Sequence, residues 1–328
     1  MKRAAILSFS ERGAALAARI AEGLEDWEAV CRAPRGDLAA QTAELFASCE
    51  ALIFVGACGI AVRAVAPLVR SKTSDPAVIV ADELGRHVIA LLSGHIGGAN
   101  ALARRVAAHI GGEAVITTAT AANARFSVDE WAARRGLRIP DMAAAKRFSA
   151  EILRRDLPLC SDFPIFGPLP AGVYLGQSGS VGAVISCANR RPFDVTLALV
   201  PRILHLGLGC KRGTSAEALR AAAAAVLKEA GLRPEAVRAV ASIDVKRDEE
   251  GLRELGIPLR FYSAVELRAV PGEFSASDFV QSTVGVDNVC ERAAMHSAGA
   301  GAVLLVPKKR AGGVTVAIAR EEWRVCFE

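Results

Sequence analysis

Aromatic residues are scarce in this sequence and make up 5% of its 328 positions. Hydrophobic residues still account for 52% of the chain and charged residues for 23%, a balance that supports a folded core and argues against disorder. A core built mainly from small aliphatic side chains is typical of layered α/β proteins. At roughly 100–200 residues per domain, the length predicts two or three domains.

Paired cysteines are also missing. The eight cysteines are scattered along the chain, and no two of them stand at the CxxC spacing. A chain of this length needs no disulfide framework, and the spacing suggests none. We therefore expect reduced thiols, most of them buried, in a cytoplasmic protein.

The sequence lacks an apolar run long enough to cross a membrane. The longest such run, Ala51–Val62, ends at Arg63, short of the ~20 residues that a spanning helix needs. Glu11 and Arg12 end the apolar start of the chain, which favours a first β-strand over a signal peptide. Both observations predict a cytoplasmic location and no membrane partner.

A strong charge of one sign is absent as well. The formal net charge is +5, and the longest basic run is Lys308-Lys309-Arg310. Nucleic-acid binding favours a basic stripe interleaved with exposed aromatic residues, so we expect no nucleic-acid partner. A mild positive net charge fits a small acidic ligand. It fits equally well a protein whose net charge has no functional role.

Residues 1–125 alternate between short apolar runs and stretches with helical spacing. The apolar runs at 4–9, 27–32, 51–55, 77–81, 87–92 and 114–117 predict strands, and the segments 11–24, 38–47, 60–68 and 99–110 predict helices. This rhythm predicts an amino-terminal Rossmann-like α/β domain, with a mostly parallel sheet covered by helices on both faces.

The rhythm changes after residue 125. Two predicted helices, at 129–135 and 143–155, precede a Pro/Gly-rich run and two short strands, so we expect a small middle domain over 126–200. A second α/β domain is predicted over 201–328. Its strands are expected at 203–206, 237–243, 259–262, 302–306 and 314–318, with a long Ala-rich helix at 215–230.

The segment Ser93–Asn100 follows a predicted strand and opens a predicted helix. Ligands of open α/β sheets bind outside the carboxyl ends of strands, and His95 lies at such a place. A histidine between glycines is poorly explained by packing, whereas its imidazole can move a proton at neutral pH. We therefore predict that His95 is a catalytic base or acid. The alternative is a structural histidine that only makes hydrogen bonds.

Charged residues near His95 in the sequence provide candidates for a catalytic partner and for substrate contacts. Asp82 and Glu83 stand in the turn before His87 and could assist His95, although adjacent carboxylates in a turn are most often solvated. Arg63 and Lys72 could bind substrate carboxylates. Arg63 ends a Gly-rich segment that begins at Gly56, where a helix start could hold an anion or simply form a tight turn. Cys58 in that segment has no base near it in the sequence.

A second Gly-rich loop, Gly207–Glu217, joins a predicted strand to the long Ala-rich helix. Its glycines, its two cations and the helix start suit an anionic group; the alternative is a capped turn with solvated charges. Thr214 and Glu217 have the spacing of a capping box. The loop matches neither the Walker A nor the GxGxxG pattern. The candidate ligand contacts are Gly209, Lys211, Arg212, Gly213, Thr214 and Ser215.

Metal-ligating patterns are weak. His205 with Cys210, or His87 with His95, lacks a third or fourth ligand at the usual spacing. We therefore expect no metal site.

Several motifs together resemble the cobalt-precorrin-5A hydrolase family over nearly the whole chain. The long segments Leu92–Asn100 and Gly207–Glu217 carry most of the resemblance, and one departure follows Thr120, where the family more often has an Asp. The remaining matching segments are Ile60–Arg63, Ser74–Val78, Ile116–Thr120, Ala241–Lys246, Asn288–Ala294 and Thr315–Ala319.

The resemblance implies a reaction and a substrate. Water opens the δ-lactone of cobalt-precorrin-5A, a tetrapyrrole rich in carboxylates, and a two-carbon fragment leaves as acetaldehyde, in anaerobic cobalamin biosynthesis. Cobalt is then carried by the substrate, and no cofactor is expected. Applied to this reaction, the predicted site gives His95 the role of base, with N–H groups at Gly97 and Gly98 holding the oxyanion and Asn100 contacting the substrate. Transient contact with neighbouring enzymes of the pathway is a further expectation.

Three other functions compete with this one. A non-catalytic corrinoid carrier of the same pathway would bind the substrate without releasing acetaldehyde. A nucleotide- or sugar-phosphate-binding enzyme is disfavoured by the glycine spacings described above. A corrinoid methyltransferase would need a pocket for S-adenosylmethionine, and no motif in the sequence indicates one.

Overall fold

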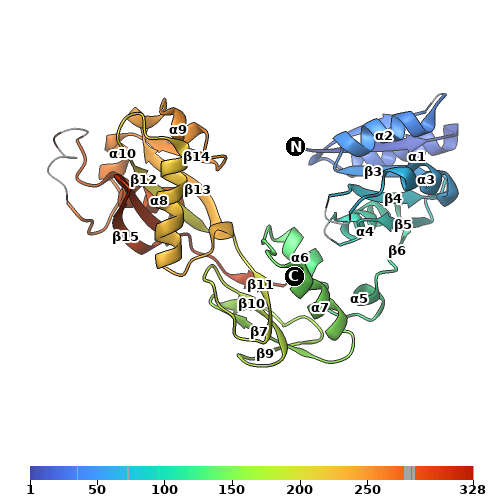
Figure 1. Ribbon diagram of the computed structural model, residues 1–328. Coiled ribbons are helices and arrows are strands. Elements are labelled where there is room, and N and C mark those ends of the chain that lie inside the picture. The colour runs from blue at the N-terminus through green and yellow to red at the C-terminus, as the bar shows by residue number, and fades with distance from the viewer. Residues whose placement is uncertain (35, 72–73, 96, 277–281, 283–284, 328) are drawn as a thin grey trace. The chain divides into compact units, whose positions relative to one another are not determined.

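The structure is a computed structural model that describes residues 1–34, 36–71, 74–95, 97–276, 282 and 285–327 (Figure 1). The chain forms two compact units. The first unit comprises Met1–Arg135, Ser149–Asp156 and Pro170–Gly172, and the second comprises Gly136–Phe148, Leu157–Leu169 and Val173–Glu328.

The first unit contains a six-stranded sheet with the order β2-β1-β3-β4-β5-β6. Its strands are β1 (Lys2–Ser8), β2 (Trp27–Arg32), β3 (Ala51–Val55), β4 (Ala77–Ala81), β5 (His87–Leu92) and β6 (Glu113–Val115). The strands β1 to β4 are mutually parallel, β5 pairs with β4 antiparallel, and β6 runs parallel to β5. The carboxyl ends of β5 and β6 therefore lie at the opposite edge of the sheet from those of β1, β3 and β4.

Helices cover both faces of this sheet. On one face, α1 (Glu11–Glu22) and α4 (Ala99–Ile110) place Leu16, Ile20, Leu102 and Val106 in one core cluster. On the other face, α2 (Leu38–Ser48) and α3 (Cys58–Val65) pack in a second cluster around Phe54. Full burial of one such apolar side chain stabilises the fold by about 1.5–3 kcal/mol. Shorter elements complete the unit, namely η1 (Ala66–Leu68), α5 (Ala119–Ala122) and α6 (Val128–Arg134).

The second unit contains two larger sheets. A parallel four-stranded sheet has the order β11-β10-β7-β9, built from β7 (Leu157–Ser161), β9 (Val173–Leu175), β10 (Val181–Ile185) and β11 (Val195–Leu199). A short parallel pair, β8 (Ile165–Phe166) with β17 (Val325–Cys326), ties the end of the chain to this region. Phe163 and Trp323 meet edge to face at 4.9 Å beside that pair. The helix α7 (Met142–Glu151) precedes β7 in the chain.

The other large sheet has the order β14-β13-β12-β16-β15. Its parallel strands are β12 (Leu204–Gly209), β13 (Val237–Ile243) and β14 (Leu259–Tyr262), and it ends in the antiparallel strands β16 (Val314–Arg320) and β15 (Val303–Ala311). The longer helices beside it are α8 (Ala216–Glu229) and α12 (Val289–Ala298). The short elements are η2 (Pro234–Ala236), η3 (Asp244–Lys246), α9 (Glu250–Arg253) and α10 (Ala264–Arg268).

The expected mixed α/β architecture is confirmed. The predicted mostly parallel amino-terminal sheet is confirmed as well, since among its described strands only the pairing of β4 with β5 is antiparallel. The physical reason is the connection between them, because parallel neighbours need a crossover of a dozen or more residues and this turn spans only 82–86. The division into units differs from the predicted segments 1–125, 126–200 and 201–328, since residues 126–135 belong to the first unit.

Candidate active site

The loop that carries His95 joins the end of β5 to α4. Three backbone hydrogen bonds fold it onto the helix start: the N–H of Ala99 donates to Ser93 O at 3.1 Å, that of Asn100 to Gly94 O at 3.0 Å, and that of Gly98 to His95 O at 3.0 Å. The first free N–H groups of α4 are thus satisfied by the loop itself. The predicted oxyanion contact through the Gly98 N–H is therefore wrong for this conformation, because the His95 carbonyl already accepts it.

Two glycines of the loop are required by close approaches. A Cβ atom at Gly94 would stand 2.7 Å from Asn100 Oδ1, and one at Gly97 would stand 2.4 Å from Ser93 Cβ. Ser93 itself has φ +58°, a conformation that serine seldom adopts. The glycines at positions 94 and 97 are therefore explained by the tight folding of the loop that carries His95.

A carboxylate and a hydroxyl bind the two ring nitrogens of His95. Its Nδ1 lies 3.1 Å from Asp129 Oδ2, and its Nε2 lies 3.3 Å from Thr120 Oγ1. Thr120 Oγ1 in turn lies 2.7 Å from Ser127 Oγ. The side chain of His95 is 21% exposed and that of Asp129 is 7% exposed, so the carboxylate is shielded while the imidazole still reaches the surface.

Asp129 stays ionised in this setting. Burial alone would raise the pKa of its carboxyl, but the hydrogen bond and the charge of His95 outweigh burial, and the net pKa is lowered. An ionised carboxylate is only an acceptor. We therefore assign the proton of neutral His95 to Nδ1, which leaves Nε2 as the acceptor that a general base needs.

The helix α6 positions Asp129. Glu130, the next residue, accepts from Arg104 Nη1 of α4 at 2.9 Å and is itself nearly buried. Trp131 is 2% exposed and packs against Phe126 with 5.8 Å between ring centroids. The Arg104–Glu130 contact joins the helix that carries Asp129 to the helix that follows His95, and the burial of Trp131 anchors α6.

Sequence reasoning missed Asp129, Thr120 and Ser127. Their contact with His95 depends on how residues 116–129 return past the end of β6, which no local pattern shows. Acidic residues in the first turn of a helix, such as Asp129 and Glu130 in α6, are common and give no signal of their own; their burial is seen only in the structure.

Asn100 is fully buried, so the predicted contact with substrate is not available to its side chain in this structure. Its Nδ2 donates to Thr118 Oγ1 at 3.3 Å, which ties α4 to the segment after β6. Asn100 Oδ1 and Ser93 Oγ are buried without a hydrogen-bond partner among the described residues.

Asp82 and Glu83 are held in the β4–β5 turn. Asp82 accepts from the N–H groups of Leu84 at 2.9 Å and His87 at 2.6 Å, and Ser10 Oγ donates to Glu83 at 2.6 Å. The six residues of β5, at about 3.3 Å each, put roughly 20 Å between this turn and the His95 loop. The predicted pairing of either carboxylate with His95 is therefore wrong, and the reason is the antiparallel direction of β5.

Arg63 and Lys72 are the two cations of the first unit that were expected to bind substrate carboxylates. The exposed side chain of Arg63 folds back along α3, where its Nη1 donates to Gly59 O at 3.2 Å. Because α3 begins at the carboxyl end of β3, Arg63 belongs to the Asp82 side of the sheet. Lys72 lies outside the described residues.

The second Gly-rich loop begins at the end of β12. Ser215 caps α8 by accepting from the Ala218 N–H at 3.2 Å, so the predicted capping box of Thr214 and Glu217 is wrong: the cap is the next residue, and Ala218 has no side-chain acceptor that could complete a box. Thr214 Oγ1 instead donates to Lys211 O at 2.8 Å. The carbonyl of Gly209 accepts from Thr315 Oγ1 at 3.1 Å.

This loop already binds one carboxylate of the chain. Gly213 N–H donates to Glu249 Oε2 at 2.8 Å, and Lys246 Nζ lies 3.0 Å from Glu249 Oε1. These two donors hold the pKa of Glu249 below its usual range. Lys211 and Arg212 stand exposed beside this contact, so the neighbourhood has the chemistry of a carboxylate-binding surface.

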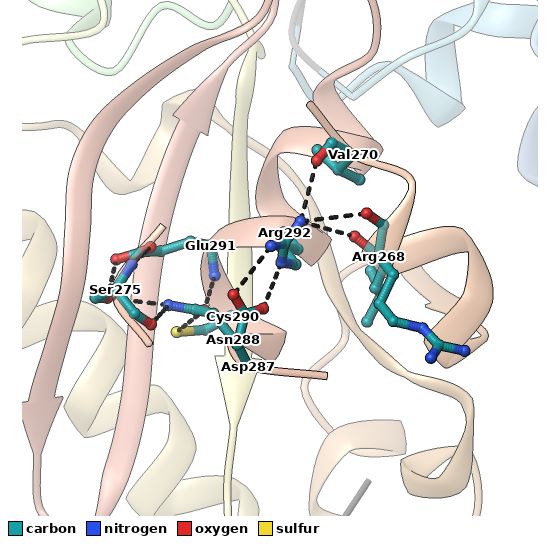
Figure 2. Close-up of polar contacts among 9 residues, drawn as sticks. Arg268, Val270, Ser275, Asp287, Asn288, Cys290, Glu291 and Arg292 are labelled. Carbon is teal, nitrogen blue, oxygen red and sulfur yellow. Dashed lines mark hydrogen bonds and ion pairs between the residues drawn. The ribbon is translucent and has the colours of Figure 1, made fainter. Parts of the chain in front are cut away.

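A polar network surrounds the start of α12 (Figure 2). The buried carboxylate of Glu291 accepts from Ser275 N at 2.9 Å, from Ser275 Oγ at 2.7 Å and from Lys308 N at 2.7 Å. Arg292 pairs with both carboxylate oxygens of Asp287 and donates to the carbonyl of Val270 at 3.0 Å. Glu291 and Arg292, which belong to one of the segments similar to the hydrolase family, therefore join α12 to neighbouring parts of the chain. These contacts give both residues a structural role.

Across the described ranges, no three His, Cys, Asp or Glu side chains gather as a metal site would require. None of the described helices is long and apolar enough to cross a bilayer. Of the eight cysteines, Cys160, Cys187 and Cys290 are buried, Cys31 is exposed and the others are partly buried. The expectation that most of them are buried is therefore wrong.

Comparison with known proteins places this architecture among proteins of cobalamin biosynthesis. The family model described as Cobalamin synthesis G N-terminal matches residues 40–121, and Cobalamin synthesis G C-terminus matches residues 204–319. The cobalt-precorrin-5A hydrolase of Salmonella typhimurium is 37% identical over 303 residues, covering 86% of this chain and 85% of that protein. The cobalt-precorrin-5A hydrolase of Priestia megaterium is 33% identical over 299 residues, with 84% and 79% covered.

Two further similarities differ in extent. Protein CobE of Sinorhizobium sp is 37% identical over 121 residues, which cover 35% of this chain and 79% of that protein. A solved structure of a putative cobalamin biosynthesis protein G homolog from Sulfolobus solfataricus aligns over 97% of both chains, at 22% identity and a TM-score of 0.44.

Proposed function

The chain belongs to the cobalt-precorrin-5A hydrolase family, and on that premise we propose that it hydrolyses cobalt-precorrin-5A to cobalt-precorrin-5B and acetaldehyde. The single observation that supports this chemistry most directly is the pairing of His95 with the shielded carboxylate of Asp129 at 3.1 Å. A non-catalytic carrier has no need for an imidazole held in one tautomer at the surface of a loop.

The first step of the reaction needs a base. Opening a lactone with water requires that a proton leave the attacking water while its oxygen bonds to the carbonyl carbon. Nε2 of His95 is the acceptor in the assigned tautomer, and Asp129 stabilises the imidazolium that forms. General acid–base catalysis of this kind contributes about 10²–10⁴-fold to a rate.

The second step needs the same group in its other protonation state. When the ring C–O bond of the lactone breaks, the alkoxide takes a proton and the products are a carboxylic acid and an alcohol. Release of acetaldehyde then breaks a carbon–carbon bond: the alcohol gives its proton to His95, which is neutral again after protonating the alkoxide, and the electron pair of the broken bond enters the conjugated macrocycle. Imidazolium at position 95 is a suitable acid for the proton that the macrocycle takes up.

Cations of the chain suit the substrate's carboxylates. We propose that Lys211 and Arg212, which are exposed on the second Gly-rich loop, bind carboxylate side chains of the macrocycle. An anionic cobalt-corrinoid is then the partner of this protein, with transient contacts to neighbouring pathway enzymes. We also propose that it works in the cytoplasm, where its cysteine thiols would stay reduced, and that it needs no added cofactor.

One experiment tests the function. The purified protein is incubated anaerobically with cobalt-precorrin-5A, and acetaldehyde is followed with a coupled aldehyde reductase. Acetaldehyde above the enzyme-free rate is the expected result. Tight corrinoid binding without acetaldehyde would overturn the proposal in favour of the carrier, and the absence of binding would overturn both.

A further inference from the structure

We propose that the hydroxyls of Thr120 and Ser127 form a proton relay that extends His95 to the reacting water; this inference rests on the proposed function. The relay is visible as consecutive contacts, from His95 Nε2 to Thr120 Oγ1 at 3.3 Å and from Thr120 Oγ1 to Ser127 Oγ at 2.7 Å. Asp129 closes the other end of the chain on Nδ1.

The direction of each hydrogen bond follows from Asp129. Because its carboxylate only accepts, the His95 Nδ1–H donates to it and Nε2 accepts. Thr120 has a single hydroxyl proton, and donating it to Nε2 leaves its oxygen free to accept from Ser127. The three donors therefore all point toward Asp129 when His95 is neutral. When His95 is doubly protonated, Nε2–H donates to Thr120 and the two hydroxyls reverse their direction.

Burial decides which hydroxyl can meet the substrate. Thr120 is 4% exposed, so a bulky macrocycle has no access to its oxygen. Ser127 is only half-buried, and it follows Phe126 at the entrance to α6. Ser127 is thus the end of the relay at which a proton can enter or leave. Thr120 passes the proton between Ser127 and His95.

The proposed transfer balances in atoms and charge. As the water oxygen bonds to the lactone carbonyl carbon, its proton passes to Ser127 Oγ, the Ser127 proton passes to Thr120, and the Thr120 proton passes to His95 Nε2. When the ring C–O bond breaks, the same path runs backwards and delivers a proton to the leaving alkoxide. One water is consumed, and the three side chains return to their starting state.

The alternative is that the two hydroxyls only satisfy one another inside the fold, as buried polar groups must. The two ideas differ in what they predict for kinetics. If the two hydroxyls have only a structural role, their removal changes the free energy of unfolding. If they form a relay, their removal changes the rate of the chemical step and the number of protons that move in its transition state.

The test compares hydroxyl-removing with hydroxyl-retaining substitutions in the full chain. Thr120→Val and Ser127→Ala are expected to lower single-turnover acetaldehyde release on the order of 10-fold to 100-fold, while corrinoid binding measured by absorbance titration changes little. Thr120→Ser and Ser127→Thr keep the hydroxyl and are expected to stay within about 3-fold of the wild-type rate. Thermal melting establishes that each variant is folded, and if Thr120→Val does not fold, Ser127→Ala and Thr120→Ser decide.

A second measurement separates the relay from a packing role. Single-turnover rates in mixtures of H₂O and D₂O are expected to curve with the deuterium fraction for the wild type, because several protons move together, and to become linear in Ser127→Ala. Wild-type rates in Ser127→Ala, or a linear wild-type dependence, would overturn the relay while leaving the hydrolase activity established. A wild-type protein that releases no acetaldehyde would overturn the proposed function itself.

Discussion

Asp129 Oδ2 lies 3.1 Å from His95 Nδ1 although 34 residues of chain separate the two. The pair forms because β5 and β6 end at the same edge of the sheet, so that the loop after β5 and the segment after β6 emerge side by side. The carboxylate is shielded and the imidazole is partly exposed. This relationship underlies the proposed chemistry and three of the predictions below.

Removal of the Asp129 charge should impair turnover and leave the fold intact. Asp129→Asn keeps the shape of the side chain but no longer favours the His95 tautomer with Nδ1 protonated. We expect acetaldehyde release to fall by about 10²–10⁴-fold. Glu130→Gln is the matched control, since its carboxylate binds Arg104 and not His95. Equal losses in both variants would point to a structural effect of α6 and contradict the assigned role.

Asp82 and Glu83 should be dispensable for turnover. They lie on the far side of β5 from His95, so Asp82→Asn and Glu83→Gln are expected to retain acetaldehyde release within about 3-fold. Asp82→Asn should still lower the free energy of unfolding by about 1 kcal/mol, because backbone N–H groups of the turn lose a charged acceptor. Urea unfolding and the coupled assay measure the two effects, and a large loss of turnover in either variant would refute this placement.

Charge on the second Gly-rich loop should affect substrate affinity and not the chemical step. In the double variant Lys211→Gln/Arg212→Gln, we expect KM to rise about 10-fold with kcat nearly unchanged, and the KM of the wild type to rise with salt. Lys309→Gln removes another exposed cation, which pairs with Glu229, and serves as the control. A fall in kcat without a change in KM would argue against a binding role.

The free energy of unfolding should depend on pH through the ionisation of Asp129. Its folded pKa is lowered, so its stabilising contribution is fully present above the unfolded value of about 3.9 and is lost as the pH falls through the folded pKa. Urea unfolding between pH 6 and pH 3 should therefore show a shallower loss of stability in Asp129→Asn than in the wild type. Identical slopes would mean that the pair contributes no pH-dependent stability.

The His95 loop should not tolerate a side chain at Gly97. A Cβ atom there would stand 2.4 Å from Ser93 Cβ and 2.9 Å from the Ser93 carbonyl oxygen. We expect Gly97→Ala to cost about 1–3 kcal/mol of stability and to reduce turnover. Gly59→Ala is the control, because its Cβ would meet only the flexible Arg63 side chain, with the nearest atom at 3.4 Å. Matching melting temperatures in the two variants would contradict the packing argument.

Local patterns predicted much of the fold. The strands β3, β4 and β13 match the expected residues, since apolar runs of that length suit a buried sheet. The direction of β5 was not predicted from the sequence, although the five-residue turn before it was visible and is too short for a parallel crossover. Without that direction, Asp82, Glu83 and Arg63 could not be assigned to the edge of the sheet opposite His95.

Only part of the candidate site could be predicted from the sequence. His95 could be identified because glycines flank it at the end of an apolar run. Its partners could not, because Thr120, Ser127 and Asp129 reach it through tertiary packing and belong to short elements without strong periodicity. Asn100 was misjudged for a similar reason, since its place at the start of α4 did not reveal that the side chain turns inward.

The most direct test of the central claim is single-turnover release of acetaldehyde from cobalt-precorrin-5A under anaerobic conditions by wild type, His95→Ala and His95→Gln. The account predicts release by the wild type and a loss of about 100-fold or more in both variants, with corrinoid binding retained. Full turnover by both His95 variants would contradict the claim that this histidine is the base.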